Sequence, residues 1–185
     1  MRTAHQTQTS PINQLHPSEA RWFAVRTNYK REKLVKQLLE RKGIANYLPL
    51  RQVTRRYTRK VRTLELPLIS CYVFVKIVRS QYVPVLETPD VLGFVKMRKD
   101  LLAIPDEEIE LLRRIAGEGI EVVADPAQYC EGDRVEIIGG NLTGLQGRLV
   151  AIDGSRVFVV ELEHIGYSLR MHVPAHLLRK VRVAV

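Results

Sequence analysis

The spacing of apolar residues along the chain predicts strands in some segments and helices in others. Alternating or continuous apolar residues predict strands at residues 21–27, 44–53, 64–78 and 92–97, followed by a short extended piece at 102–104. Residues 72–75 are apolar or aromatic throughout, which is typical of a central strand that is buried on both faces.

Apolar residues at helical spacing predict three helices between these strands. Leu34, Val35, Leu38 and Leu39 indicate a helix from about residue 29 to 42, with Gly43 as its stop signal. Residues 80–87 favour a short helix, and a third helix follows Pro105, where acids occupy the first turn. The order strand, helix, strand, strand, helix, strand is typical of a ferredoxin-like domain in an α+β protein.

A glycine-rich segment after residue 130 predicts a second, smaller domain. Its apolar positions Val135 and Ile137 alternate with polar ones, and a second strand is expected at 148–152. Glycines suit the bent connection because they accept positive φ and let backbones approach closely, and they occur at Gly132, Gly140, Gly144 and Gly147. The pattern resembles the KOW motif, which opens a small SH3-like β-barrel. Three more strands are expected at 157–162, 168–173 and 178–183.

The composition limits what the rest of the chain can be. Of 185 residues 45% are hydrophobic, but no apolar run approaches the ~20 residues that a membrane-spanning helix needs. Residues 1–19 are polar and lack the apolar core of a signal peptide, so we expect a disordered tail on a cytoplasmic protein. The expected divisions are a first domain at 20–116, a linker at 117–128 and a barrel at 129–185.

Positive charge is concentrated in the first part of the chain. Up to Ala116 there are 22 Lys and Arg against 11 Asp and Glu, a balance of +11, whereas the remainder has 7 against 9, a balance of −2. A basic field attracts polyanions, so we expect nucleic acid at the first domain and protein at the second.

The candidate nucleic-acid contacts lie on the first helix and in the segment 54–63, which we expect to be a mobile hairpin tip or loop. They are Lys30, Arg31 and Lys33 on the helix, and Arg55, Arg56, Tyr57, Arg59, Lys60 and Arg62 in the segment. Tyr57 could stack on a base. The alternative is that both groups are solvated surfaces that bind nothing.

Several stretches together resemble the NusG family of transcription factors. The similar stretches are Trp22–Val25 for the opening strand, Lys30–Glu32 for the first helix, Pro67–Val75 for the central motif Pro-Leu-Phe-Pro-Gly-Tyr-Val-Phe-Val, and Thr88–Val95. Ile69, Ser70 and Cys71 replace the usual Phe-Pro-Gly, and Asp90 replaces a glycine. These departures suggest a specialised paralogue, similar to RfaH or the UpxY proteins.

The resemblance implies a factor that rides on RNA polymerase and suppresses pausing or termination. The first domain would dock an apolar patch on the clamp coiled coil and touch DNA in the elongation complex, and the barrel would recruit a ribosomal protein or Rho. The candidate docking residues are Trp22, Ile69, Tyr72 and Phe94. The alternative is that all four belong to the core.

Other classes of function find less support in the sequence. Cys71 and Cys130 lack metal-ligand spacing, Pro174 interrupts the pair His172 and His176, and no phosphate-binding glycine loop is present. We therefore expect a monomer that is no enzyme and has neither cofactor nor metal. A ribosomal or other RNA-binding KOW protein is the main rival.

Overall fold

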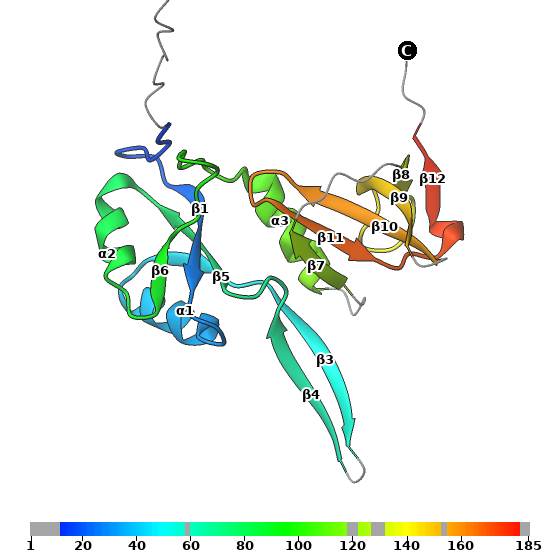
Figure 1. Ribbon diagram of the computed structural model, residues 1–185, viewed down its shortest axis with the longest axis horizontal. Coiled ribbons are helices and arrows are strands. Elements are labelled where there is room, and N and C mark those ends of the chain that lie inside the picture. Colours follow the sequence, from blue (N-terminus) through cyan, green and yellow to red (C-terminus); the bar gives the residue numbers. More distant parts are fainter. Residues whose placement is uncertain (1–11, 58–59, 118–121, 127–131, 153–154, 182–185) are drawn as a thin grey trace, which may run out of the picture.

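The computed structural model describes residues 12–57, 60–117, 122–126, 132–152 and 155–181 (Figure 1). The first domain contains β1 (Arg21–Thr27), α1 (Glu32–Arg41), β2 (Ala45–Tyr47), β3 (Leu50–Tyr57), β4 (Lys60–Pro67), β5 (Tyr72–Ile77), η1 (Arg79–Gln81), α2 (Tyr82–Leu86), β6 (Val91–Phe94) and α3 (Asp106–Gly117). The second contains β7 (Val122–Pro126), β8 (Asp133–Ile137), β9 (Gln146–Ile152), β10 (Ser155–Leu162), β11 (Tyr167–Met171), η2 (Ala175–Leu177) and β12 (Leu178–Lys180).

The first domain is built on an antiparallel sheet with the strand order β2-β5-β1-β6. Side chains alternate along its strands, so each strand contributes to two separate cores. Phe23 and Val25 of β1 belong to one buried cluster, while Trp22 and Ala24 belong to the other. Because both faces are covered, the central strands read as continuous apolar runs, and the predicted α+β ferredoxin-like fold is confirmed.

Helices α1 and α2 close one face of this sheet, which we call the helix-pair face. Val35 and Leu39 of α1 and Val85 of α2 are fully buried in its cluster. Phe94 of β6 packs there too, stacked on Tyr82 at 4.6 Å between ring centroids.

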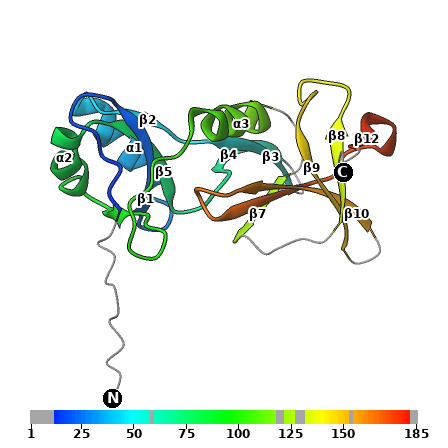
Figure 2. The ribbon, with the colours of Figure 1, turned by 90° about the horizontal axis from the view of Figure 1, so that it is seen from above.

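Helix α3 lies on the opposite face, which we call the α3-side face, and the barrel lies next to it (Figure 2). Its apolar residues Ile109, Leu112 and Ile115, at helical spacing, are buried in one cluster that continues from Phe74 of the sheet into the barrel. The two domains therefore share a hydrophobic core.

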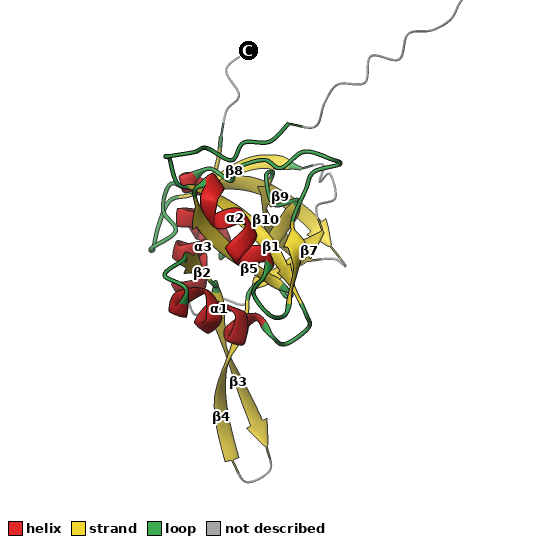
Figure 3. Cartoon of the chain, turned by 90° about the vertical axis from the view of Figure 1, so that its left-hand side faces the viewer, coloured by secondary structure: helices red, strands yellow, loops and turns green. Residues whose placement is uncertain are grey.

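Strands β3 and β4 form a long hairpin that projects away from both domains (Figure 3). The ladder runs from Leu50 paired with Pro67 to Tyr57 paired with Lys60. Segment 54–63 is the end of this hairpin, as one of the two expectations had it, and its described residues are strand and not loop. The predicted strand 44–53 is divided in two, because residues 48 and 49 separate β2 from β3 and Pro49 cannot donate to a ladder.

The barrel sheet has the strand order β12-β8-β9-β10-β11-β7. Its first strand, β7, lies inside the segment 117–128 that the sequence predicted to be a linker, and it pairs with β11. Apolar and polar residues do not alternate clearly in β7, which explains why the pattern missed it.

The glycines of the predicted KOW motif are required by their surroundings. A Cβ atom on Gly132 would lie 2.2 Å from the Leu149 carbonyl oxygen, and one on Gly147 would lie 2.5 Å from the Val159 carbonyl oxygen. Gly140 and Gly144 have φ values of +77° and +85°, which L-residues adopt at a cost. Val135 and Ile137 are buried, as the alternation predicted.

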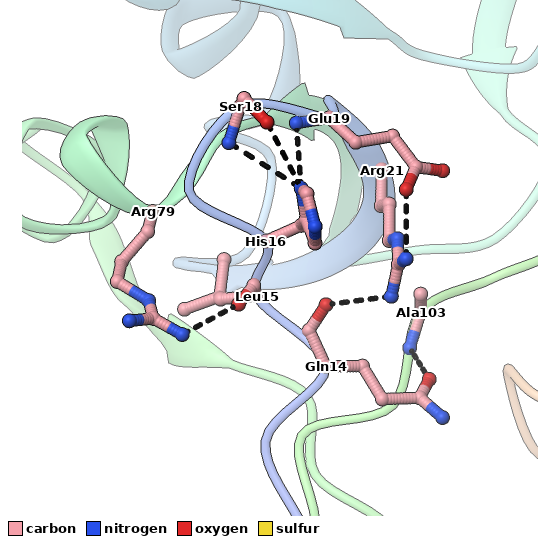
Figure 4. A network of polar contacts seen from close by, with 8 residues as sticks. All are labelled: Gln14, Leu15, His16, Ser18, Glu19, Arg21, Arg79 and Ala103. Carbon is pink, nitrogen blue, oxygen red and sulfur yellow. Dashed lines mark hydrogen bonds and ion pairs between the residues drawn. The ribbon is translucent and has the colours of Figure 1, made fainter.

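Residues 12–19, here called the N-terminal segment, pack on the first domain (Figure 4). Leu15 is buried in the cluster of the helix-pair face, and Asn13 forms a bridge with Leu101. The expected disordered tail at 1–19 is therefore wrong for these eight residues, while residues 1–11 lie outside the described part. With only Ile12 and Leu15 as aliphatic residues, this polar stretch gave no periodic signal.

Candidate functional site

The α3-side face of the sheet gathers aromatic side chains from three strands. The register sets Trp22 of β1 opposite Lys76 of β5, and Tyr47 of β2 opposite Phe74 of β5. Tyr72 lies on the same side as Phe74 because it is two residues away on β5. The face thus carries aromatic residues from Trp22 at one end of the central strand pair to Tyr72 at the other.

A pocket of about 470 Å³ opens beside Trp22, between β5 and α3. The Trp22 indole N–H donates to Asp106 Oδ1 at 2.8 Å, and Lys76 Nζ donates to the same oxygen at 3.0 Å. The bond from Lys76 lowers the pKa of Asp106, so this carboxylate is ionised at neutral pH.

Two cations flank the indole ring in this pocket. Lys76 Nζ lies 5.7 Å and the Arg113 guanidinium carbon 6.0 Å from the Trp22 ring, within the range of cation–π attraction. Arg113 also lies 5.2 Å from the ring of Tyr47. Five of the seven residues that line the pocket are charged, and Trp22 itself is 6% exposed, so the pocket is a charged depression beside a largely buried ring.

The barrel covers the other end of the α3-side face. The ring of Tyr72 meets that of Tyr167 from β11 edge to face, with 5.2 Å between centroids. Burial, with the Tyr167 hydroxyl adding to it, raises the pKa of Tyr72 to about 12.

Helix α3 holds the barrel through charged side chains near both of its ends. Glu108 Oε1 accepts hydrogen bonds from the His164 ring Nδ1 at 2.7 Å and from the His164 backbone N–H at 3.3 Å. Arg114 donates to the carbonyl oxygens of Asn141 and Thr143 at 3.0 and 2.9 Å. The interface therefore joins an apolar centre to exposed polar contacts.

The four predicted docking residues do not form one exposed patch. Trp22 borders the pocket but is only 6% exposed, and Ile69 is only 1% exposed, so both belong to the shared core, as the alternative expected. Tyr72 lies under the barrel. Grouping Phe94 with them is wrong, because it pairs with Val25 and faces the helix-pair side. The alternation of side chains along a strand assigns Phe94 and Trp22 to opposite faces of the sheet only once the register between β1 and β6 is known.

Two further residues of this region carried no clear sequence signal. Tyr47 flanks Arg113 as described above, and burial raises its pKa to about 12. Glu32 is 3% exposed, and its Oε1 accepts the Cys71 backbone N–H at 2.7 Å. This bond fixes the turn before Tyr72, where Cys71 has a φ of +64°.

The predicted cations on the first helix lie at its N-terminal end. Lys30 is exposed and its Nζ sits 5.0 Å from the ring of the exposed Tyr29. Arg31 Nε bonds Asp90 Oδ2 at 3.0 Å, and Lys33 Nζ lies 3.4 Å from Glu65 of the hairpin. The ion pair with Glu65 places this helix end beside the base of the hairpin.

The hairpin carries the remaining predicted cations. Arg55, Arg56 and Tyr57 end β3, Lys60 and Arg62 begin β4, and Arg59 lies outside the described residues. Arg55 stands directly opposite Arg62 in the ladder.

The described residues show neither a metal cluster nor a membrane helix. No group of three or more His, Cys, Asp or Glu side chains among them is placed to hold a metal ion. Within the same residues, no helix is both long enough and apolar enough to cross a membrane.

Comparison with known proteins identifies the family. A family model described as "Transcription termination factor nusG" matches residues 20–113, and "Transcription elongation factor SPT5, second KOW domain" matches residues 131–181. The transcription termination/antitermination protein NusG of Streptococcus pyogenes serotypes M1 and M18 is 30% identical over 150 residues, which cover 74% of this chain and 83% of the relative.

A solved structure shares the fold of both domains. The structure described as "Domain interaction in Thermotoga maritima NusG" is 23% identical, with a TM-score of 0.56, and covers 89% of this chain and 98% of its own. With a family model over more than half of the chain and relatives at 30% identity, the chain belongs to the NusG family of transcription termination and antitermination factors.

Proposed function

We propose that this chain is a transcription elongation or antitermination factor that binds RNA polymerase through the α3-side face of its first domain. The observation that carries the proposal is the pocket at Trp22 together with Tyr72 at the far end of the same face. Aromatic residues and arginines are enriched at the energetic centres of protein interfaces, and this face carries Trp22, Tyr47, Tyr72 and Arg113. The family supports polymerase as the partner.

The barrel competes with polymerase for this face. Tyr167 packs on Tyr72, so a partner that uses Tyr72 must displace the barrel. Ile165, in the barrel turn between β10 and β11, is buried in the cluster that the two domains share. Displacement would expose this turn, and a second protein recruited by the barrel, such as a ribosomal protein or Rho, would then find an apolar surface.

Nucleic acid in the elongation complex is the proposed partner of the hairpin and of the N-terminal end of α1. The support is the +11 balance of the first domain and the concentration of Arg and Lys residues along the two strands of the hairpin. The hairpin projects away from the body, where it can reach a polyanion without moving either domain (Figure 3).

The test of polymerase docking is a binding titration with purified RNA polymerase and two alanine variants. Tyr72→Ala should weaken binding by about 2 kcal/mol, roughly thirty-fold in Kd, because it removes an anchor. Leu92→Ala, an apolar side chain that is 62% exposed on β6, is the matched control and should bind normally. Equal affinities for both variants would refute docking through this face, and co-purification with ribosomal subunits alone would favour an RNA-binding role.

The test of the hairpin uses a salt series with a reconstituted elongation complex. Replacing Arg55, Arg56, Arg59 and Arg62 by Ser should flatten the slope of log affinity against log salt by about 2 to 3, because each phosphate contact releases counterions. A control with the same loss of charge replaces Lys36, Arg41, Arg179 and Lys180. If both variants give parallel slopes, the hairpin makes no phosphate contact.

A further inference from the structure

A tight basic turn follows β6 and takes no part in the surfaces described above. Residues 96–99 read Lys-Met-Arg-Lys, and we call them the basic turn. Met97 and Asp100 exchange two backbone hydrogen bonds, at 3.0 and 2.9 Å, so that Arg98 and Lys99 form a two-residue tip. Arg98 has a φ of +58°, which is typical of such a tip.

The cations of the basic turn are exposed and have no ion pair within the described part of the chain. Lys96, Arg98 and Lys99 each exceed a third of their possible exposure and take part in none of the described hydrogen bonds or salt bridges. The neighbouring acid, Asp100, accepts the backbone N–H of Ile12 at 2.8 Å instead. Three positive charges in four residues thus point to an external anion.

The N-terminal segment holds the basic turn in place. Leu101, just after the turn, donates to the Ile12 carbonyl oxygen and accepts from the Gln14 backbone N–H. The Gln14 side chain also accepts the Ala103 backbone N–H at 2.7 Å (Figure 4). Because the backbone on both sides is bonded, binding an anion here costs little ordering of the chain.

The same network anchors the segment to the sheet. Arg79 donates to the carbonyl oxygens of Leu15 and His16, and Arg21 donates to that of Gln14 (Figure 4). His16 Nδ1 accepts the Glu19 backbone N–H at 2.8 Å and so closes the turn that leads into β1. These bonds connect the basic turn rigidly to the start of β1.

The basic turn lies at the end of β1 opposite to the hairpin (Figure 1). Ile104 bridges Trp22 near the start of β1, whereas Asn28 and Arg31 follow its end. A seven-residue strand is about 20 Å long, so the two basic regions are separated by roughly that distance. The turn is exposed while the barrel covers Tyr72, so its access needs no separation of the domains.

We propose that the basic turn is a second nucleic-acid contact, which binds the phosphate backbone of a duplex. Cations without an aromatic platform suit phosphates, whereas unpaired bases need a ring to stack on, and among residues 96–100 there is none. Two of the three cations are Lys, which is depleted at protein interfaces, so an acidic protein is the weaker candidate. The proposal extends the function proposed above, but its test contains no polymerase and stands separately.

The test measures binding of the full chain to a 25-base-pair duplex of mixed sequence by fluorescence anisotropy between about 50 and 200 mM salt. The variant is Lys96→Gln, Arg98→Asn and Lys99→Gln, with Asn chosen because it tolerates positive φ. The control, Lys36→Gln, Arg41→Gln and Lys180→Gln, removes the same charge elsewhere. A single substitution, Arg98→Lys, keeps the charge and should keep the wild-type slope.

The triple variant should flatten the salt slope on the duplex by about 2 to 3, whereas the control should leave the slope near that of wild type. Unchanged thermal unfolding would show that the turn still folds. A duplex slope of the triple variant equal to that of the control would refute the proposal. The proposal would also be refuted if the triple variant lost affinity only for a single-stranded oligonucleotide. The same holds if it kept the wild-type salt slope on the duplex but lost binding to an acidic protein.

Discussion

The two faces of the first domain's sheet are closed by different kinds of cover. On the helix-pair face, Phe23, Val25 and Val75 are fully buried under helices that belong to the same domain. On the α3-side face, Trp22 borders an open pocket and Tyr72 is closed by a ring from another domain. One sheet thus carries a face that is closed within its own domain and a face that is closed in part by the second domain, which under our proposal can leave.

The polar contacts of the second cover explain why it can separate. Glu108 and Arg114 of α3 bind the barrel through groups that water can replace, and Glu108 Oε2 is buried there without a hydrogen-bond partner. Such polar contacts contribute less to the stability of the closed arrangement than close-packed apolar side chains of the same area. The face that we propose for polymerase binding is therefore the one closed with mixed polar and apolar contacts.

The largest expected effect comes from breaking the permanent face. Phe23→Ala should lower the free energy of unfolding of the first domain by about 3 to 5 kcal/mol, because it leaves a cavity in a fully buried core. Tyr72→Ala, on the separable face, should cost no more than about 1 to 2 kcal/mol, since its ring is partly exposed. Denaturant unfolding followed by circular dichroism measures both values, and equal costs would remove the distinction between the faces.

The next effect concerns the separable cover. Glu108→Arg removes two hydrogen bonds to a charged group and sets a cation against His164, so the closed arrangement should lose about 2 kcal/mol. The barrel should then tumble independently, which ¹⁵N relaxation detects as different correlation times for the two domains. If the proposed docking face is right, polymerase binding should tighten at the same time.

Glu107→Arg is the matched control for this variant. The neighbouring side chain is exposed and lines the pocket at Trp22, with no described contact to the barrel. It should leave the domains tumbling together. One common correlation time for Glu108→Arg would mean that the apolar contacts hold the barrel without this carboxylate.

The strands and helices of both faces could be predicted from local patterns, but the packing of the barrel on the α3-side face could not. The KOW glycines and the helical spacing of Ile109, Leu112 and Ile115 report local geometry, and the structure agrees with them. Tyr72 and Tyr167 meet across 95 residues of chain, and nothing near either residue specifies the other. Phe94 was misplaced for the same reason, because its face depends on a register between distant strands.

A smaller effect concerns the two residues that replace family glycines. Cys71 and Asp90 have φ values of +64° and +68°, so both occupy conformations that favour glycine. Cys71→Gly should raise the free energy of unfolding by about 1 kcal/mol by relieving this strain. Asp90→Gly should raise the free energy of unfolding by less, because it also removes the hydrogen bonds of the Asp90 carboxylate to Asn28 and Arg31. These bonds lower the pKa of Asp90. Thermal unfolding of both variants makes the comparison, and a larger gain at Asp90 would contradict it.

The smallest expected effect separates the covered and the open parts of the α3-side face by their tyrosines. Burial raises the pKa of both Tyr47 and Tyr72 to about 12, but only Tyr72 depends on the barrel, through Tyr167. Because the folded pKa lies above the ordinary value of about 10, each neutral phenol contributes stability that is fully present below pH 10 and is lost as the pH rises toward 12. Alkaline titration at 295 nm in a Tyr47→Phe background should show one late tyrosine among the described ones, and Tyr167→Ala should bring it back toward pH 10. A late transition that survives Tyr167→Ala would show that α3 and the sheet alone bury Tyr72, and that the barrel does not control access to it.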